Sequence, residues 1–150
     1  MNKELWGNTV WYLFHTIAEK IKEEEFLNNK NSIIEIIKST CFILPCPECS
    51  NHATNILKTI NFTNMTTKEE LKTFLFNFHN DINKKLGKPI YNIENLNIYK
   101  NANFNIITNN FKIILSQNSN VPQLMNYSFK RQKSLPNILT HINNIIPHMQ

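Results

Sequence analysis

The sequence that decides the fold is the stretch from residue 67 to residue 89, TKEELKTFLFNFHNDINKKLGKP. Its apolar residues recur at three- and four-residue steps, which is the period of one buried face of an α-helix. Thr67 and Glu70 form a capping box, the signature of a helix start. Gly87 and Pro89 are typical of a helix end. The stretch therefore predicts a long amphipathic helix whose apolar stripe needs cover from other elements: Leu71, Phe74, Leu75, Phe78, Ile82 and Leu86.

The same helical spacing occupies most of the sequence before residue 104. Proline positions set two of the boundaries, because a residue before proline leaves the helical region and proline itself suits a first helical turn. Four long helices with short connections predict an all-α fold, an antiparallel four-helix bundle. The expected elements are a first helix over 3–25, a second that opens at Asn31 or Ser32 and ends before Pro45, a third with Pro47 in its first turn, a fourth after Thr67 and a short fifth over 93–101.

Residues 104–150 follow the 1–103 domain as a C-terminal extension of less regular pattern. Apolar residues between 104 and 115 suit either a helix or a strand, and residues 118–122 suit a loop. An apolar stripe before Pro147 fits one or two amphipathic helical turns. Because this apolar stripe lies on a segment without acidic residues, we expect a helical appendage for dimerisation or partner docking. The stripe is Ile138, Leu139, Ile142, Ile145 and Ile146.

Length and composition indicate one soluble domain. The chain has 150 residues, of which 41% are hydrophobic, and this supports one ordinary core. No apolar run approaches the roughly 20 residues of a membrane span, and the first residues lack the apolar region of a secretory signal. The net charge is +5, and residues 101–150 hold four basic residues and no acidic one. With a single Arg and no nucleic-acid-binding motif, the Lys excess indicates a solvated surface, so we expect no nucleic acid partner.

Cys46 and Cys49 form the motif that carries chemistry, Cys-Pro-Glu-Cys, at the predicted start of the third helix. A helix N-terminus stabilises a thiolate, and two cysteines at this spacing can close a reducible disulfide whose outer sulfur is open to attack. Two other interpretations exist. With His52 and His79, the pair has the ligand types of a zinc site. A thioredoxin-like site needs a sheet that the helical pattern does not provide.

Polar side chains gather on two of the predicted helices. Trp11 and His15 share a face of the first helix, and His79 and Asn83 share a face of the fourth, with Asn80 beside them. Any one of these residues, taken alone, can be a buried polar group that its neighbours satisfy. Five of them converging near a dithiol favour a bound planar polar ligand such as a cofactor.

On these residues the chain resembles the Erv/ALR family of FAD-dependent sulfhydryl oxidases. The resemblance covers residues 5 to about 100 and is greatest to the branch carried by large cytoplasmic DNA viruses. Residues 104–150 resemble no family that we can name. The matching stretches are Trp6-Gly7 with Trp11 and His15-Thr16-Ile17-Ala18, Leu44-Pro45-Cys46-Pro47-Glu48-Cys49 with His52, and His79-Asn80-Asp81-Ile82-Asn83-Lys84-Lys85-Leu86-Gly87-Lys88-Pro89.

The resemblance implies that the helical bundle holds FAD beside the CxxC pair. By this resemblance Cys46 is the outer sulfur that exchanges with substrate thiols, and Cys49 faces the flavin, which reduces O2 to H2O2. A cofactor is needed because no protein side chain carries two electrons to O2. The implied cofactor-binding residues are Gly7, Trp11, His15, Cys49, His52, His79, Asn80, Asn83, Lys85, Lys88, Tyr91 and Tyr99, with no metal site.

Some of these assignments have a physical reason in the sequence, and others have a second explanation that does not involve a cofactor. Gly7 lets the backbone approach the cofactor closely. Lys88 suits the pyrophosphate, whereas Lys84 and Lys85 suit equally well the negative end of the fourth helix. Tyr99 stands in place of a late Trp that commonly closes the site in the family.

Departures from the family pattern change what we expect of electron transfer. The chain lacks the second, shuttle CxxC of many members, so electrons should arrive directly from a thiol-bearing protein substrate or a small dithiol relay protein. Asn8 stands where other members often have Arg, which puts one cofactor contact in doubt. Cys41 fits a buried apolar position rather than a third redox centre. The resemblance also implies a homodimer through the first two helices, in the host cytoplasm and in the virion.

Three functions compete on this basis. The preferred one is an FAD-linked thiol oxidase that forms disulfide bonds in a viral cytoplasmic pathway, because the three motifs occur in register. The alternative is a zinc-stabilised helical binding module that uses Cys46, Cys49, His52 and His79 as ligands. The third is an inactive bundle that serves as a virion scaffold. Bound flavin and thiol-dependent oxygen uptake distinguish the three.

Overall fold

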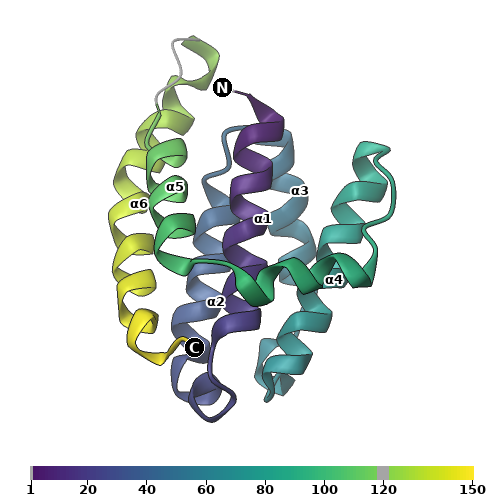
Figure 1. The fold of residues 1–150 in the computed structure, drawn as a ribbon. Helices are drawn as coiled ribbons and strands as arrows, with labels where there is room; N and C mark the ends of the chain where they lie inside the picture. Colours follow the sequence, from purple (N-terminus) through teal and green to yellow (C-terminus); the bar gives the residue numbers. More distant parts are fainter. Residues whose placement is uncertain (1, 118–121) are drawn as a thin grey trace.

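The computed structural model describes residues 2–117 and 122–150. In these ranges every named element is a helix, and the one β-type pairing is an isolated antiparallel bridge between Ile21 and Met149 (Figure 1). The predicted all-α class is therefore confirmed. The α-helices are α1 (Lys3–Lys20), α2 (Phe26–Phe42), α3 (Pro47–Lys58), α4 (Lys68–Leu86), α5 (Phe104–Leu115) and α6 (Met125–Ile145). The short 3-10 helices are η1 (Glu23–Glu25), η2 (Phe62–Asn64), η3 (Ile93–Asn101), η4 (Pro122–Leu124) and η5 (Ile146–His148).

Helix α3 begins, and helix α4 both begins and ends, where the local sequence signals predict. The hydroxyl of Thr67 accepts a hydrogen bond from the backbone N–H of Glu70 at 3.1 Å, which completes the cap of α4. Gly87 ends α4 with φ at 71°, in the left-handed region that favours glycine. Pro47 occupies the first turn of α3, and Cys46 is its N-cap. The short fifth helix also exists, as the 3-10 helix η3.

The predicted boundaries between the first two helices are wrong. Helix α1 stops at Lys20 instead of continuing to residue 25, because Ile21 is extended and pairs with Met149. Helix α2 starts at Phe26 rather than at Asn31 or Ser32. Phe26 is fully buried, and the side-chain amide of Asn29 donates to the Glu25 carbonyl at 2.8 Å. Tertiary burial thus overrides the weak helix propensity of the Asn-rich segment.

Helix α1 lies at the centre of the molecule. It packs against α2, α4, α5 and η3, while α2 packs against α3 on one side and α6 on another (Figure 1). This position explains why α1 buries residues around much of its circumference. The core is continuous through the helices and includes Leu13, Phe14, Ile17, Ile33, Ile36, Leu71 and Leu75.

The C-terminal extension is part of this core. Helix α5 packs on α1 and helix α6 packs on α2, so the segment left open between helix and strand is helical. Ile138, Ile142 and Ile145 are fully buried. Three of the five residues of the expected docking stripe therefore face the core, whereas Leu139 is half-buried and Ile146 is exposed. Helix α6 is far longer than the predicted one or two turns. Of the predicted loop at 118–122, residues 118–121 lie outside the described residues.

The last residues of the chain close back on the turn between α1 and α2. The backbone N–H of Gln150 donates to the Lys20 carbonyl at 2.6 Å, and the Lys22 N–H donates to the His148 carbonyl at 3.1 Å. The His148 side chain lies 3.1 Å from the Glu25 carboxylate. Within the described ranges, no helix has the length and apolar character of a membrane span.

Candidate functional site

A cavity of about 440 Å³ lies between the N-terminal half of α1, the start of α3 and the C-terminal half of α4. This volume is in the range of sites for small molecules and cofactors, which are roughly 300–1,000 Å³. Its lining includes eight of the residues predicted to bind a cofactor: Gly7, Trp11, Cys49, His52, His79, Asn83, Lys85 and Lys88.

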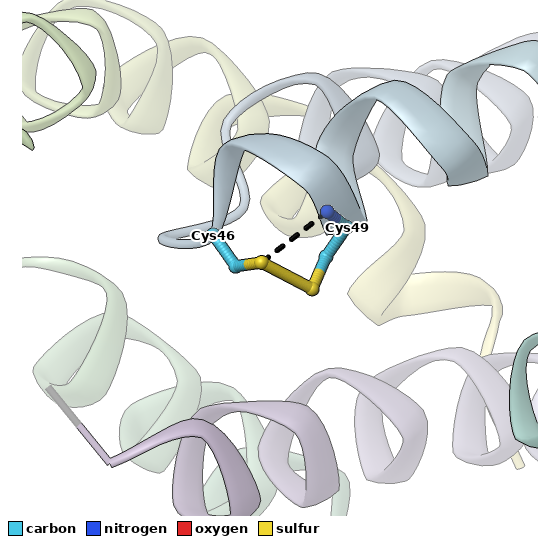
Figure 2. The surroundings of a disulfide bond; sticks show 2 residues. All are labelled: Cys46 and Cys49. Carbon is cyan, nitrogen blue, oxygen red and sulfur yellow. Dashed lines mark hydrogen bonds between the residues drawn. A yellow bond between two sulfur atoms is a disulfide. The ribbon is translucent and has the colours of Figure 1, made fainter. Parts of the chain in front are cut away.

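The CxxC pair stands at the edge of this cavity. Cys46 and Cys49 are joined as a disulfide with their Cα atoms 5.2 Å apart, and the Cys49 N–H donates to the Cys46 sulfur at 3.3 Å (Figure 2). Cys49 lines the cavity, whereas Cys46 is the N-cap of α3 and does not. Both residues are half-buried. The sulfurs therefore have different neighbours, one beside the cavity and one at the helix start.

A pair of buried histidines lies at one wall, which His79 lines and His15 supports from behind. His15 Nε2 and His79 Nδ1 are 2.9 Å apart, so one ring donates a hydrogen bond to the other. Burial, and then the neighbouring His79, lowers the pKa of His15 to about 3. Burial, and then the Lys88 charge, lowers the pKa of His79 to about 4. Both imidazoles are therefore neutral at neutral pH, and each can serve as donor or acceptor.

Aromatic rings are stacked against this histidine pair. The Trp11 and His79 rings are almost parallel, 7° apart in orientation with centroids 4.0 Å apart. Tyr91 stacks on His79 at 4.3 Å. The hydroxyls of Tyr91 and Tyr99 are 3.3 Å apart, and burial raises the pKa of both phenols. His15, Tyr91 and Tyr99 do not line the cavity. They form a layer behind the residues that do.

Asn80 and Asn83 bond to the backbone after α4 rather than standing free. The Tyr91 N–H donates to the Asn80 side-chain oxygen at 2.6 Å, and the Asn80 amide donates back to the Tyr91 carbonyl at 3.2 Å. The Asn83 amide donates to the Pro89 carbonyl at 3.3 Å. In the structure these two residues hold the segment that carries Lys88 and Tyr91 against α4.

His52 provides an independent sign that the cavity is built for a ligand. Its Nε2 atom is buried and has no hydrogen-bond partner. An unpaired buried polar group costs about 1–3 kcal/mol, so native structures rarely retain one without a reason. Because His52 lines the cavity one helical turn after Cys49, a polar ligand bound there would satisfy this nitrogen.

The space beside the Cα atom of Gly7 is open. It lines the cavity, and a Cβ atom built on it would meet no atom within 4 Å. Packing within the protein therefore does not require glycine at this helical position, where alanine is intrinsically favoured by about 1 kcal/mol. A ligand that approaches the backbone of α1 would explain why the side chain is missing.

The cavity also has lining residues that were not among the predicted cofactor-binding residues. Trp6, Phe14 and Phe78 form apolar wall, and Cys41 lies among them with a thiol whose pKa is raised by burial. Cys41 is 2% exposed, in line with the expected buried apolar position. The helical spacing already placed Phe78 on a buried face, but it did not indicate that this face borders a cavity.

The zinc alternative has no support in the geometry. Within residues 2–117 and 122–150, no three His, Cys, Asp or Glu side chains come together in a way that could hold a metal ion. Two of the four proposed ligands, Cys46 and Cys49, are joined to each other, and His79 is hydrogen-bonded to His15.

Known proteins resemble this chain over about two thirds of its length. The chain is 31% identical over 90 residues to the candidate FAD-linked sulfhydryl oxidase 096R of Invertebrate iridescent virus 3, which covers 59% of this chain and 61% of that protein. It is 31% identical over 97 residues to FAD-linked sulfhydryl oxidase ERV1 of Oryza sativa subsp. japonica, covering 65% of this chain and 50% of that protein. It is 32% identical over 103 residues to the FAD-linked sulfhydryl oxidase of African swine fever virus (isolate Tick/Malawi/Lil 20-1/1983), covering 68% and 86%.

The chain thus spans between half and two thirds of the length of the first two of these relatives. No solved structure matches it. The model of the Erv1 / Alr family matches residues 8–102, a range that contains both the disulfide and most of the cavity wall. The chain belongs to the Erv1 / Alr family.

Proposed function

We propose that this chain is an FAD-linked sulfhydryl oxidase that forms disulfide bonds in thiol substrates. The observation that carries the proposal is the position of the disulfide, with Cys49 on the wall of a cavity that also holds the unpaired His52 nitrogen. The relatives from three sources that carry the name FAD-linked sulfhydryl oxidase support the same activity.

The residues around the cavity fit FAD in chemical type. The apolar wall and the stacked rings of Trp11 and His79 suit a planar ring system. His52 Nε2 can hydrogen-bond a polar ring atom, and Lys85 and Lys88 bring positive charge for a pyrophosphate. When bound, FAD accepts two electrons from the dithiol and passes them to O2, giving H2O2.

The protein's own residues carry out the thiol exchange. A substrate thiolate attacks Cys46 Sγ, the Cys46–Cys49 bond breaks, and Cys49 leaves as a thiolate within the first turn of α3, where the helix N-terminus stabilises negative charge. The second substrate thiol then displaces Cys46. The substrate becomes a disulfide, two electrons remain on the reduced pair, and Cys49 holds its thiolate at the cavity wall.

The wider setting of the reaction is part of the same proposal. The substrate is a thiol-bearing protein or a small dithiol relay protein, and the viral relatives favour the host cytoplasm and the virion as its location. A homodimer, expected from the family resemblance, has to use parts of α1 and α2 that α5 and α6 leave uncovered. Analytical ultracentrifugation of the full chain tests this expectation.

An absorption spectrum and an oxygen electrode test the proposed activity. The purified protein should show flavin bands and consume O2 when dithiothreitol is added. Cys49→Ser should bind FAD but lose turnover by about a thousandfold or more, because the electron path to the cavity is cut. Oxygen uptake that persists in this variant contradicts the role of Cys49. Flavin without any oxygen uptake in the wild type favours the scaffold alternative, and stoichiometric zinc without flavin favours the zinc module.

A further inference from the structure

Helix α6 lies along α2 and runs antiparallel to it (Figure 1). Two contacts fix how the helices are aligned. His141 Nδ1 lies 3.2 Å from the Ser32 hydroxyl, and Lys130 Nζ lies 3.3 Å from the centre of the Phe42 ring. The two helices are therefore antiparallel, and Lys130 lies beside Phe42, the last residue of α2. The first turn of α6, which precedes Lys130, extends beyond this end of α2.

The end of α2 is in turn joined to the start of α3. The Ser50 hydroxyl donates to the Phe42 carbonyl at 2.9 Å, and Ser50 is one helical turn after Cys46. Phe42, the residue under Lys130, is therefore held against the first turn of the helix that carries the disulfide. The start of α6 and the outer sulfur, Cys46, belong to the same end of the fold.

The side chains exposed there are of two kinds, apolar and basic. Phe129 is 64% exposed, Met125 is 53% exposed and Phe42 is 48% exposed, and a cluster of exposed large apolar side chains is typical of an interaction site. Phe129 lies between Met125 and Lys133 at four-residue steps, so the three form one exposed stripe. We call Phe42, Met125, Phe129, Lys130 and Lys133 the α6 patch.

The charge around the α6 patch is positive. Residues 101–150 contain no acidic residue, so Lys130 and Lys133 have no carboxylate side chain on their own helix. Two carboxylates lie on neighbouring elements. Glu35 accepts a hydrogen bond from the Ser39 hydroxyl, and Glu48 is an exposed residue in the first turn of α3 that also lines the cavity. The patch therefore complements a ligand that is apolar and acidic.

We propose that the α6 patch docks the thiol substrate of this chain, and that the docking segment of that substrate is acidic with apolar side chains. The inference rests on the proposed oxidase function and adds the class of partner. A thiol partner seated on the patch has its own cysteines near Cys46, where exchange begins. Charge complementarity of this kind steers association and sets partner preference. The motif-bearing part of the chain supplies the chemistry, and the extension selects the protein that receives it.

Two reduced peptides with the same Cys-Gly-Gly-Cys centre test this, one flanked by Glu and Leu and the other by Lys and Leu. Oxygen uptake is measured for each with the full holoprotein, beside dithiothreitol. The acidic peptide should have the higher kcat/KM, by about tenfold at low salt, and this preference should shrink as salt rises. The variant Lys130→Glu/Lys133→Glu should abolish or reverse the preference through KM.

The matched control is Lys22→Glu/Lys100→Glu, which makes the same change in net charge in the turn between α1 and α2 and at the end of η3, away from the α6 patch. It should keep most of the wild-type preference. Phe129→Ser should weaken both peptides together without changing their ratio, since it removes apolar contact only. Thermal melting of each variant establishes that it is folded.

Other outcomes overturn the proposal. Equal kcat/KM for the two peptides in the wild type, or equal losses in the patch and control variants, show that α6 does not select the substrate. Binding of RNA or of phosphatidylserine vesicles that depends on Lys130 and Lys133, without peptide preference, assigns the patch to another partner. No oxidation of dithiothreitol by the wild type contradicts the oxidase function itself, so the two failures are distinguishable.

Discussion

Residues 8–102 and residues 103–150 differ in what identifies them and in what they contribute. The first region matches a family model and carries the disulfide, the cavity and the stacked rings. The second lies outside that match, yet α5 and α6 contribute fully buried residues to the same core. A few polar residues at fixed spacing are enough to reveal chemistry. Packing needs only an apolar period, which many sequences share. The extent of a family match therefore does not mark the extent of the folded unit.

The sharpest way to break this comparison is to remove a buried side chain of α6. Ile142 is fully buried between α6 and α2, so Ile142→Ala should lower the free energy of unfolding by about 2–5 kcal/mol. Urea unfolding followed by circular dichroism measures the change. Because the core is continuous, the extension should unfold in the same transition in which the cavity releases FAD. The rise in flavin fluorescence reports this release.

Ile113→Ala on α5 is the matched control, because Ile113 is 52% exposed and its removal should change stability by less than about 0.5 kcal/mol. Two separate transitions in either protein, one for each region, indicate that residues 103–150 are a detachable appendage. That result restores the sequence-based expectation and removes the argument for one folded unit.

A smaller effect concerns the buried histidine pair in the first region. The pKa values of His15 and His79 are lowered to about 3 and about 4, so the unfolded chain binds more protons than the folded one between pH 6.5 and about 4. Stability should therefore fall as pH falls through this window, on the order of 2 kcal/mol. Unfolding free energies from pH 7 to pH 4 measure the slope.

His15→Gln isolates the histidine contribution, since glutamine keeps a polar side chain but does not titrate. Carboxylates titrate in both proteins, so the difference between the two stability curves reports on His15 and on its coupling to His79. The advantage of the wild type should shrink as the pH falls. Parallel curves show that His15 does not have the lowered pKa that its burial implies.

Local signals account for what the sequence predicted well. The capping box at Thr67 and the glycine at residue 87 set both ends of α4, and Pro47 set the start of α3, because each acts through its own backbone. The start of α2 was missed because it depends on burial of Phe26 by distant residues. The length of α6 was missed for a related reason, since Pro136 lies inside it and burial against α2 maintains the helix on both sides.

The site shows the same division. The motifs named the residues of the cavity wall, but they did not distinguish residues that line it from those that support it. Asn80 and Tyr91 illustrate this, because their mutual hydrogen bonds are formed by a turn that only the folded chain brings together. Sequence spacing shows which residues share a helix face. It does not show which of their polar atoms are already bonded to backbone.

The smallest expected effect concerns Gly7, where one substitution should change FAD affinity and the stability of the FAD-free protein in opposite directions. Gly7→Ala should raise the stability of the FAD-free protein by up to about 1 kcal/mol, because alanine favours the helix and its Cβ meets no atom within 4 Å. The same methyl group occupies space at the cavity wall, so FAD affinity should fall, by about tenfold if a van der Waals contact is lost and the ring is displaced. Thr9→Ala, also on α1 but outside the cavity lining, should raise helix stability without changing FAD affinity. Thermal melting and flavin titration of the two variants measure both quantities. If Gly7→Ala binds FAD as tightly as the wild type, the cofactor does not approach this turn of α1, and the missing side chain needs another explanation.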